Sequence, residues 1–167
     1  MNYHNITHDD MNNGDGLRVV LWLAACDHKC YNCQNPQTWD SNSGILFDNN
    51  AEEEIFTELS KEYISGLTLS GGDPLHRNNL PEVFLLIKKM EERFPQKTIW
   101  LFTGYTWEEI ENDKQKYEIV SSCDVIIDGE YIDKLRDITL KWRGSSNQRV
   151  IDVKKTLEEN KIVLYCD

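Results

Sequence analysis

The chain has little positive charge. Its 167 residues include 18 Lys and Arg against 29 Asp and Glu, which gives a formal net charge of −11. Nucleic-acid affinity comes largely from Lys and Arg that track phosphates, and the sequence has no run of basic residues. We therefore expect no nucleic-acid partner.

Long apolar runs are missing as well. The longest spans Val19 to Ala25, whereas a helix needs about 20 apolar residues to cross a bilayer. The opening residues M-N-Y-H-N-I-T-H-D-D contain neither a basic leader nor an apolar stretch typical of a signal peptide. We expect a cytoplasmic protein with no membrane association.

Cysteines are few and unevenly placed. Three of the five fall within C-D-H-K-C-Y-N-C, from Cys26 to Cys33, and the others are Cys123 and Cys166. An odd number in this arrangement suits a reducing compartment better than a disulfide framework. The clustered thiols are predicted to be metal ligands.

The chain has no internal repeat and no linker-like segment, so residues 1–167 are predicted to form a single domain. Blocks of apolar residues typical of buried strands occur at Leu17–Ala24, Gly66–Leu69, Lys97–Thr103, Asp124–Asp128, Arg149–Val153 and Ile162–Tyr165. Helical periodicity occurs at Ala51–Ser65, Leu80–Phe94, Trp107–Glu118 and Val153–Asn160. Capping boxes are expected for the first of these helices from Asn50 and Glu53, and for the third from Thr106 and Glu109.

Strands that alternate with helices predict an α/β fold with a largely parallel sheet, either open or curved into an incomplete βα barrel. In both arrangements, ligands bind at the carboxyl ends of the strands. Four unusual features follow directly after predicted strands, namely Cys26, Gly71-Gly72-Asp73-Pro74, Gly104-Tyr105 and Asp128-Gly129. We expect them to converge on one site.

Three neighbouring cysteines do not complete a structural zinc site, which needs four ligands. The fourth would have to be His28, inside the motif, Cys123, at the start of a predicted buried strand, or the penultimate Cys166. A four-iron cluster held by three thiolates leaves one iron free to bind a substrate. The missing ligand therefore favours a catalytic iron–sulfur cluster over zinc.

The spacing C-x3-C-x2-C after the first predicted strand resembles that of the radical S-adenosylmethionine superfamily. Further similarity extends over nearly the whole chain and is carried by N-N-G-D-G-L-R, N-P-Q-T-W, L-S-G-G-D-P-L-H, I-W-L-F-T-G-Y, V-I-I-D-G and W-R-G-S-S-N-Q-R-V-I-D. These segments resemble the glycyl-radical-enzyme activases that act on anaerobic ribonucleoside-triphosphate reductase. The resemblance implies a single-domain, incomplete parallel βα barrel of the radical S-adenosylmethionine type.

The resemblance also implies a set of ligand-binding residues. Cys26, Cys30 and Cys33 would bind a [4Fe–4S] cluster, whose fourth iron would bind the methionyl amine and carboxylate of S-adenosylmethionine. The expected cofactor contacts are Asn32, Cys33 and Gln34 near the nucleoside, Gly71, Gly72 and Asp73 at the methionyl amine, and Asp128 after the fourth predicted strand.

Some of these positions have a simpler interpretation. Gly71-Gly72 and Asp128 also suit ordinary turns after strands. Gln34 stands where related proteins commonly have an aromatic residue, and Glu130 stands where related activases often have lysine. Three further residues, Arg143, Asn147 and Arg149, suit either ligand binding or surface contacts around a turn.

The implied activity is reductive cleavage of S-adenosylmethionine to a 5′-deoxyadenosyl radical, which takes a hydrogen atom from a glycine in the large subunit of the reductase. A flavodoxin-like protein would supply the electron. Because the cofactors supply the chemistry, no catalytic side chain is expected. Two alternatives remain: another radical S-adenosylmethionine enzyme, such as a pyruvate formate-lyase activase or a deazaguanine synthase, and a non-enzymatic zinc-binding interaction module.

Overall fold

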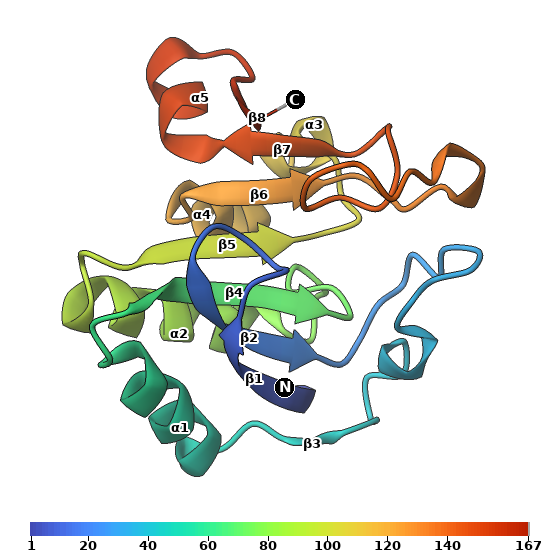
Figure 1. Cartoon of the computed structure of the whole chain (residues 1–167). Helices are drawn as coiled ribbons and strands as arrows, with labels where there is room; N and C mark the ends of the chain where they lie inside the picture. Colours follow the sequence, from blue (N-terminus) through green and yellow to red (C-terminus); the bar gives the residue numbers. More distant parts are fainter. Residues whose placement is uncertain (167) are drawn as a thin grey trace.

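The structure is a computed structural model that describes residues 1–166. It contains one eight-stranded mixed sheet with the order β3-β1-β2-β4-β5-β6-β7-β8 (Figure 1). The strands are β1 Asn2–Asp10, β2 Leu17–Leu23, β3 Ile45–Leu46, β4 Ile64–Gly71, β5 Thr98–Phe102, β6 Val125–Asp128, β7 Arg149–Asp152 and β8 Leu164–Cys166. The helices are α1 Asn49–Leu59, α2 Leu80–Arg93, α3 Trp107–Glu111, α4 Lys114–Ser121 and α5 Val153–Glu159, with short 3-10 helices at Pro36–Thr38 and Asp133–Leu135.

The predicted mixed α/β fold with a largely parallel sheet is confirmed. Strands β2, β4, β5 and β6 run parallel. The strands outside this central group, β1 and β3 on one side and β7 and β8 on the other, join antiparallel. In Figure 1 the arrowheads of the four parallel strands point the same way, so the segments that follow them project from one edge of the sheet.

Two expectations for helix boundaries are wrong. The capping box from Asn50 and Glu53 does not form, because Asp48 caps α1 and accepts hydrogen bonds from the amides of Asn50 and Ala51 at 3.0 Å each. This helix also ends at Leu59 rather than Ser65, since Ser65 belongs to β4.

The segment expected to form one helix from Trp107 to Glu118 forms two. The predicted capping box of Thr106 and Glu109 is confirmed at the start of α3. Asp113 then caps α4, accepting hydrogen bonds from the amides of Gln115 and Lys116 at 3.1 and 3.2 Å. Because Asp113 caps the start of a second helix, the segment cannot continue as a single helix through this residue.

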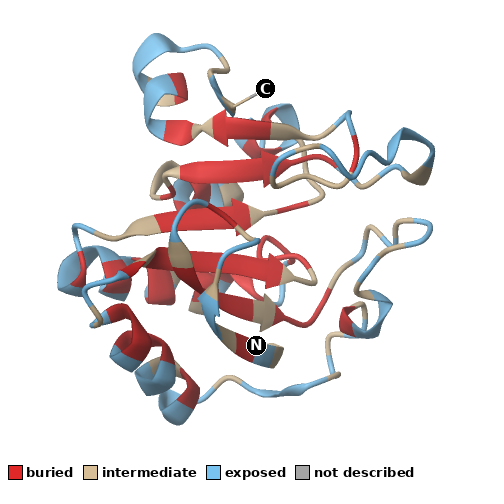
Figure 2. Ribbon diagram, viewed as in Figure 1, coloured by how far each residue is buried: buried red, intermediate tan, exposed pale blue. Residues whose placement is uncertain are grey.

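The central strands consist mainly of buried residues (Figure 2). Their apolar side chains pack on both faces of the sheet, as expected for parallel strands. One face packs against the helices and contains Leu69, Leu101 and Ile126. The other face holds a smaller cluster of Trp100, Val125, Ile127 and Val150, against which Trp142 packs. Alternation along each strand therefore assigns neighbouring residues to different cores.

Arg18 joins three strands at the amino ends of the parallel group. Its guanidinium is fully buried and donates to Thr68 Oγ1 at 2.7 Å, Leu67 O at 2.8 Å and Thr98 O at 2.9 Å. It also lies over the Trp100 ring, 5.4 Å from the centroid. Burial lowers the pKa of Arg18 to about 10, which still leaves it charged at neutral pH.

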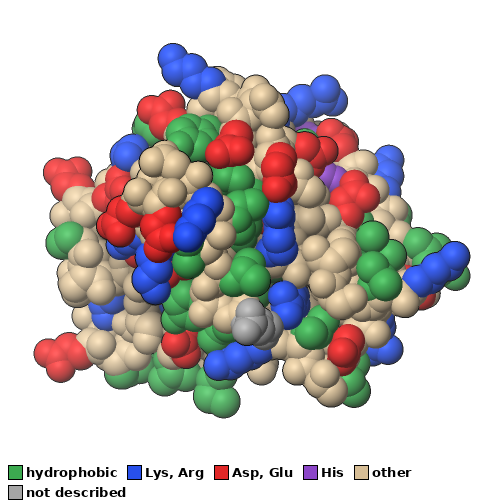
Figure 3. All heavy atoms as spheres, turned by 90° about the horizontal axis from the view of Figure 1, so that it is seen from above, with side chains coloured by type: hydrophobic (Ala, Val, Ile, Leu, Met, Phe, Trp, Pro, Cys, Tyr) green, Lys and Arg blue, Asp and Glu red, His purple; other side chains and the backbone are tan. Residues whose placement is uncertain are grey.

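Acidic and basic side chains are interspersed on the face seen from above in Figure 3. Within residues 1–166, none of the helices combines the length and the hydrophobicity needed to cross a membrane.

Candidate functional site

A cavity of about 400 Å³ lies at the carboxyl edge of the parallel strands. Residues from four separate strand ends line it, namely Cys26, the segment 71–73, Gly104 and Gly129. These segments lie far apart in the sequence and meet because parallel strands end at one edge of the sheet. The structure thus brings together the features that follow the predicted strands, except Pro74, Tyr105 and Asp128, which do not line this cavity.

Residues 26–33, the cysteine loop, form one wall of the cavity. Cys26, Cys30 and Cys33 all line it, are partly buried and are free of disulfides. The loop turns sharply, with positive φ at Lys29 and Asn32 and a hydrogen bond from Cys33 N to Cys30 O at 3.1 Å.

The three thiols suit iron by their chemistry. Thiolates are the usual ligands of iron–sulfur clusters, and these three are presented by one loop to one cavity. In the described part of the chain, no three His, Cys, Asp or Glu side chains converge closely enough to enclose a single metal ion. The case for an iron–sulfur cluster at this site therefore rests on the chemical type of the three ligands and on their placement around one cavity.

The thiols of Cys26 and Cys30 resist ionisation in this environment. Burial, with the nearby Asp73 carboxylate, raises the pKa of Cys26 to about 11. Burial likewise raises the pKa of Cys30. Because a metal binds the thiolate form, loading iron would release protons from these groups.

The Gly-Gly-Asp segment, residues 71–73, is fastened to the start of the cysteine loop. The amide of Gly72 donates to Leu23 O, and the amide of Asp73 donates to Ala25 O, both at 2.7 Å. A Cβ atom on Gly72 would lie 2.5 Å from Ala25 O. Glycine is needed here because the two backbones approach too closely for any side chain.

The carboxylate of Asp73 is buried and has several protein partners. It is 1% exposed and accepts hydrogen bonds from Thr103 Oγ1 at 2.9 Å, Gly104 N at 3.0 Å and Leu75 N at 2.8 Å. These contacts join the end of β4 to the end of β5. Asp73 therefore stabilises the ends of these two strands, a role that is separate from the cofactor contact expected from the sequence.

His28 connects the cysteine loop to two other parts of the site. Its Nε2 lies 2.9 Å from Asp73 Oδ2, and its Nδ1 lies 2.7 Å from Glu130 Oε1. The ring packs edge-on against Tyr105, with 4.6 Å between centroids. Burial lowers the pKa of His28, but the two carboxylates outweigh it and raise the pKa to about 9.

The sequence alone does not predict this arrangement. His28 is a candidate zinc ligand there, and Glu130 stands in place of a lysine. In the structure, Glu130 pairs with His28, the histidine inside the cysteine motif.

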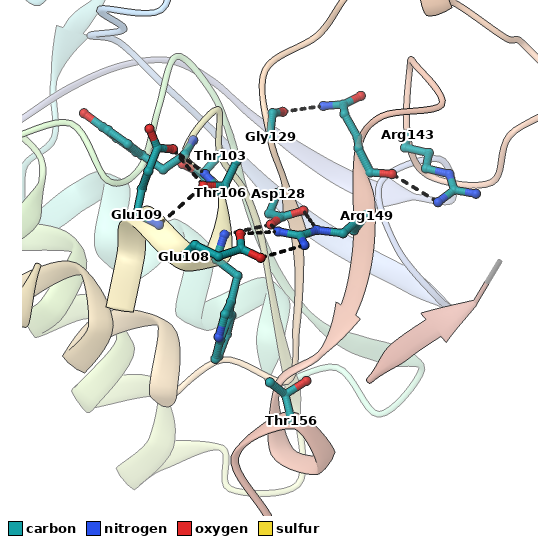
Figure 4. Close-up of polar contacts among 12 residues, drawn as sticks. Thr103, Thr106, Glu108, Glu109, Asp128, Gly129, Arg143, Arg149 and Thr156 are labelled. Atoms are coloured by element: carbon teal, nitrogen blue, oxygen red, sulfur yellow. Dashed lines mark hydrogen bonds and ion pairs between the residues drawn. The ribbon is translucent and has the colours of Figure 1, made fainter. Parts of the chain in front are cut away.

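Asp128 lies outside the thiol-lined cavity. It is 1% exposed, accepts a hydrogen bond from Trp107 N at 2.8 Å and pairs with Arg149 (Figure 4). Arg149 also donates to both carboxylate oxygens of Glu108, at 3.0 and 2.8 Å. Asp128 thereby joins β6 to α3 and β7, and its expected contact with the cofactor stays a prediction.

This ion-pair network shifts the ionisation of its members. Hydrogen bonds from Arg149 lower the pKa of Glu108 to about 2. Hydrogen bonds to Glu108 and Asp128 raise the pKa of Arg149 above its usual value. Glu108 and Arg149 therefore both remain charged at neutral pH.

Asn32 and Gln34 are both exposed on or beside the cysteine loop. Gln34 lines the cavity and Asn32 does not. The structure therefore places only Gln34 where a bound molecule could contact its side chain directly.

Residues 129–148, the β6–β7 segment, form the opposite wall of the cavity. Trp142, Arg143 and Gln148 line it. The Gln148 side chain donates to Gly129 O at 2.9 Å and accepts from Gly144 N at 3.0 Å, which holds the two ends of the segment together (Figure 4). The W-R-G-S-S-N-Q motif is the sequence signal for this wall.

Comparison with known proteins agrees with this site. Residues 12–151 match the family model described as a 4Fe-4S single cluster domain. The anaerobic ribonucleoside-triphosphate reductase-activating protein of Enterobacteria phage T4 is 47% identical over 150 residues, covering 90% of this chain and 93% of that protein. The proteins of the same name from Escherichia coli strain K12 and Haemophilus influenzae are each 40% identical, over 90% and 89% of this chain and 97% and 96% of their own lengths.

The match over most of the chain, together with a three-thiol cavity at the carboxyl edge of the sheet, defines a 4Fe–4S protein of the single-cluster class. Within that class, the chain belongs to the family of anaerobic ribonucleoside-triphosphate reductase-activating proteins.

Proposed function

We propose that this protein activates an anaerobic ribonucleoside-triphosphate reductase by generating a glycyl radical on its large subunit. The observation that carries this proposal is the position of the three thiols. Cys26, Cys30 and Cys33 line one cavity with the Gly-Gly-Asp segment, in a chain that matches the activating proteins over about nine-tenths of its length.

In this proposal, Cys26, Cys30 and Cys33 hold a [4Fe–4S] cluster, and the fourth iron binds S-adenosylmethionine. When bound, the cluster and S-adenosylmethionine would supply one-electron reductive cleavage of the C5′–S bond, with the electron from a flavodoxin-like reductant and methionine as the leaving group, and the hydrogen-atom abstraction from the reductase glycine. The remaining work of the chain is to position these groups and exclude water.

The chain's own residues suit that work. Gly71 and Gly72 present backbone to the cavity, so an ammonium group could approach their carbonyl oxygens without meeting a side chain. Gln34 lies at the cavity edge, where it could meet the nucleoside. Asp73 and His28 hold the two walls in place through contacts of 2.7 to 3.0 Å.

The finer description of the fold also belongs to this proposal. We infer that residues 1–167 form one radical S-adenosylmethionine domain, an incomplete parallel βα barrel. The four parallel strands, with helices packed on one face, support this assignment. A barrel left open would give access to a polypeptide substrate, and a reducing cytoplasm would keep the thiols free to bind iron.

The decisive experiment compares cysteine variants after anaerobic reconstitution with iron and sulfide. We expect Cys26→Ala, Cys30→Ala and Cys33→Ala each to abolish release of methionine and 5′-deoxyadenosine from S-adenosylmethionine. Cys166→Ala is the matched control and should retain this activity. With the reductase present, wild-type protein should produce a glycyl-radical signal in electron paramagnetic resonance.

Three outcomes would contradict the proposal. Full cleavage activity in Cys30→Ala would overturn the ligand assignment. Cleavage without a glycyl radical would leave a radical enzyme with another substrate. Anaerobically purified protein that holds stoichiometric zinc and no iron would indicate the zinc-binding module instead.

A further inference from the structure

The thiol-lined cavity contains one permanently charged cation. Among the Lys and Arg residues in the part of the chain that the structure describes, Arg143 is the one that lines it. The other ionisable groups in the lining are the three thiols, Tyr131, and the His28–Asp73 pair.

Arg143 has few partners inside the protein. One guanidinium nitrogen, Nη1, donates to Gln148 O at 3.1 Å (Figure 4). The Nε atom is buried and has no hydrogen-bond partner. Within residues 1–166, no carboxylate lies within ion-pair distance of Arg143. A guanidinium carries five N–H donors, and leaving a buried donor unpaired is unfavourable.

The other arginine in the W-R-G-S-S-N-Q-R segment is already neutralised. Arg149 pairs with Asp128 and Glu108 and lies in a neighbouring cavity. Asn147, the third residue of unassigned role, donates its amide to Glu130 O at 2.8 Å.

Position 130 also supplies no positive charge. Glu130 stands where related activases often have lysine, and its carboxylate pairs with His28. The other cation in the lining, His28, is already paired with Asp73 and Glu130. A ligand with a negatively charged group would therefore find its counter-charge in this cavity at Arg143. An arginine that lines an open cavity and has no carboxylate partner is suited to bind a carboxylate through two parallel hydrogen bonds from its guanidinium.

We propose that Arg143 binds the α-carboxylate of S-adenosylmethionine. This inference rests on the proposed function, because it assigns one residue to one group of that cofactor. Gln148 supports it by tying Gly129 to Gly144, which fixes the stretch of backbone next to Arg143.

The test measures binding rather than turnover. Reconstituted protein, kept anaerobic and without reductant, is titrated with S-adenosylmethionine and with decarboxylated S-adenosylmethionine, in which hydrogen replaces the carboxylate. The variants are Arg143→Gln and Arg143→Lys, with Arg136→Gln as the matched control. Arg136 is an exposed arginine of the same segment and does not line the cavity.

We expect Arg143→Gln to weaken binding of S-adenosylmethionine about tenfold or more, the scale of a lost charged hydrogen bond. Its effect on the decarboxylated ligand should be less than about threefold, and Arg143→Lys should show an intermediate loss. The decarboxylated ligand binds more weakly to every variant because it lacks one iron-binding group. The informative quantity is therefore the change that each substitution causes for each ligand.

Equal losses for both ligands, or no loss for either, would overturn the assignment. Unchanged affinity for S-adenosylmethionine with weaker binding of the reductase would assign Arg143 to a carboxylate of the partner and also overturn it. If Arg143→Gln takes up less iron than wild type, the Arg143→Lys comparison decides, since lysine keeps the charge and loses the paired geometry. Wild-type protein that binds no S-adenosylmethionine would contradict the proposed function itself.

Discussion

His28 Nδ1 lies 2.7 Å from Glu130 Oε1, and this contact joins the cysteine loop to the β6–β7 segment across the cavity. The two residues are 102 positions apart in the chain. The loop that carries the thiols is therefore held from its middle as well as from its ends.

Loss of this contact should loosen the cysteine loop without unfolding the protein. We expect Glu130→Ala to release iron to a chelator several-fold faster than wild type. The unfolding free energy should change by less than about 1 kcal/mol, because the Glu130 side chain is 54% exposed. Glu118→Ala, at an exposed helix position, is the control. Equal rates of iron release in Glu130→Ala and wild type would show that the contact does not hold the loop.

Removal of Arg149 should destabilise the fold. Arg149→Met leaves the carboxylate of Asp128, which is 1% exposed, without its cation. We expect a loss of about 2–4 kcal/mol in the unfolding free energy, measured by urea denaturation under reducing conditions. Arg136→Met is the control and should lie within about 0.5 kcal/mol of wild type.

Neutralising Asp128 tests whether its unpaired charge causes this loss of stability. Adding Asp128→Asn to Arg149→Met should recover part of the lost stability, because the buried charge is gone. A double variant less stable than Arg149→Met alone would show that Asp128 contributes through its other contacts instead.

Acid should weaken the contact between Glu108 and Arg149. The folded-state pKa of Glu108 is lowered from its ordinary value of 4.5 to about 2. Its stabilising effect is therefore present above the ordinary pKa and is lost as the pH falls from about 4.5 towards 2. We expect the difference in urea midpoint between wild type and Glu108→Gln to shrink over that range. Glu111→Gln is the control, and a difference that stays constant with pH would contradict the assignment.

A side chain at Gly72 should separate the Gly-Gly-Asp segment from the cysteine loop. In Gly72→Ala, the new methyl group would lie 2.5 Å from Ala25 O, which is backbone and can move only with the loop. We expect lower iron content after reconstitution and at least tenfold weaker binding of S-adenosylmethionine, on the scale of about 1.4 kcal/mol per tenfold.

Gly129→Ala separates this effect from simple backbone strain. Gly129 has φ of +91°, but the nearest atom to its added Cβ would be 3.9 Å away. This variant should lose stability by about 1 kcal/mol and keep its iron. If both variants lose iron equally, backbone strain rather than contact with Ala25 is responsible.

The central strands could be predicted because their apolar blocks are long and rich in β-branched residues. Of the flanking strands, β7 and β8 could be predicted as well, whereas β1 and β3 could not. In β1 only Ile6 is buried, so its sequence resembles that of a polar loop, and β3 consists of the exposed Ile45 and Leu46. The sequence also does not reveal that β7 runs antiparallel, since its direction is set by the 20 residues of the β6–β7 segment, which returns to the sheet without a crossover helix.

The site was predictable to the extent that its residues are close in sequence. The cysteine loop and Gly71-Gly72 each form a recognisable local motif. The pairing of His28 with Glu130 depends on contacts between distant segments, and no local pattern encodes it. Arg143 and Arg149 look equivalent in sequence, and they differ only in which carboxylates the fold places beside them.

Arg18 stands at the opposite end of the sheet from the cysteine loop. Its guanidinium fastens β2, β4 and β5 through neutral acceptors, so this end of the scaffold does not depend on anything bound at the other end. We therefore expect the amino end of the sheet to stay folded when a loop at the carboxyl edge is exchanged. A chimera that keeps the strands of this chain and takes the β6–β7 segment from another activase should fold. Its binding to the two reductases would show whether that segment determines which partner is recognised.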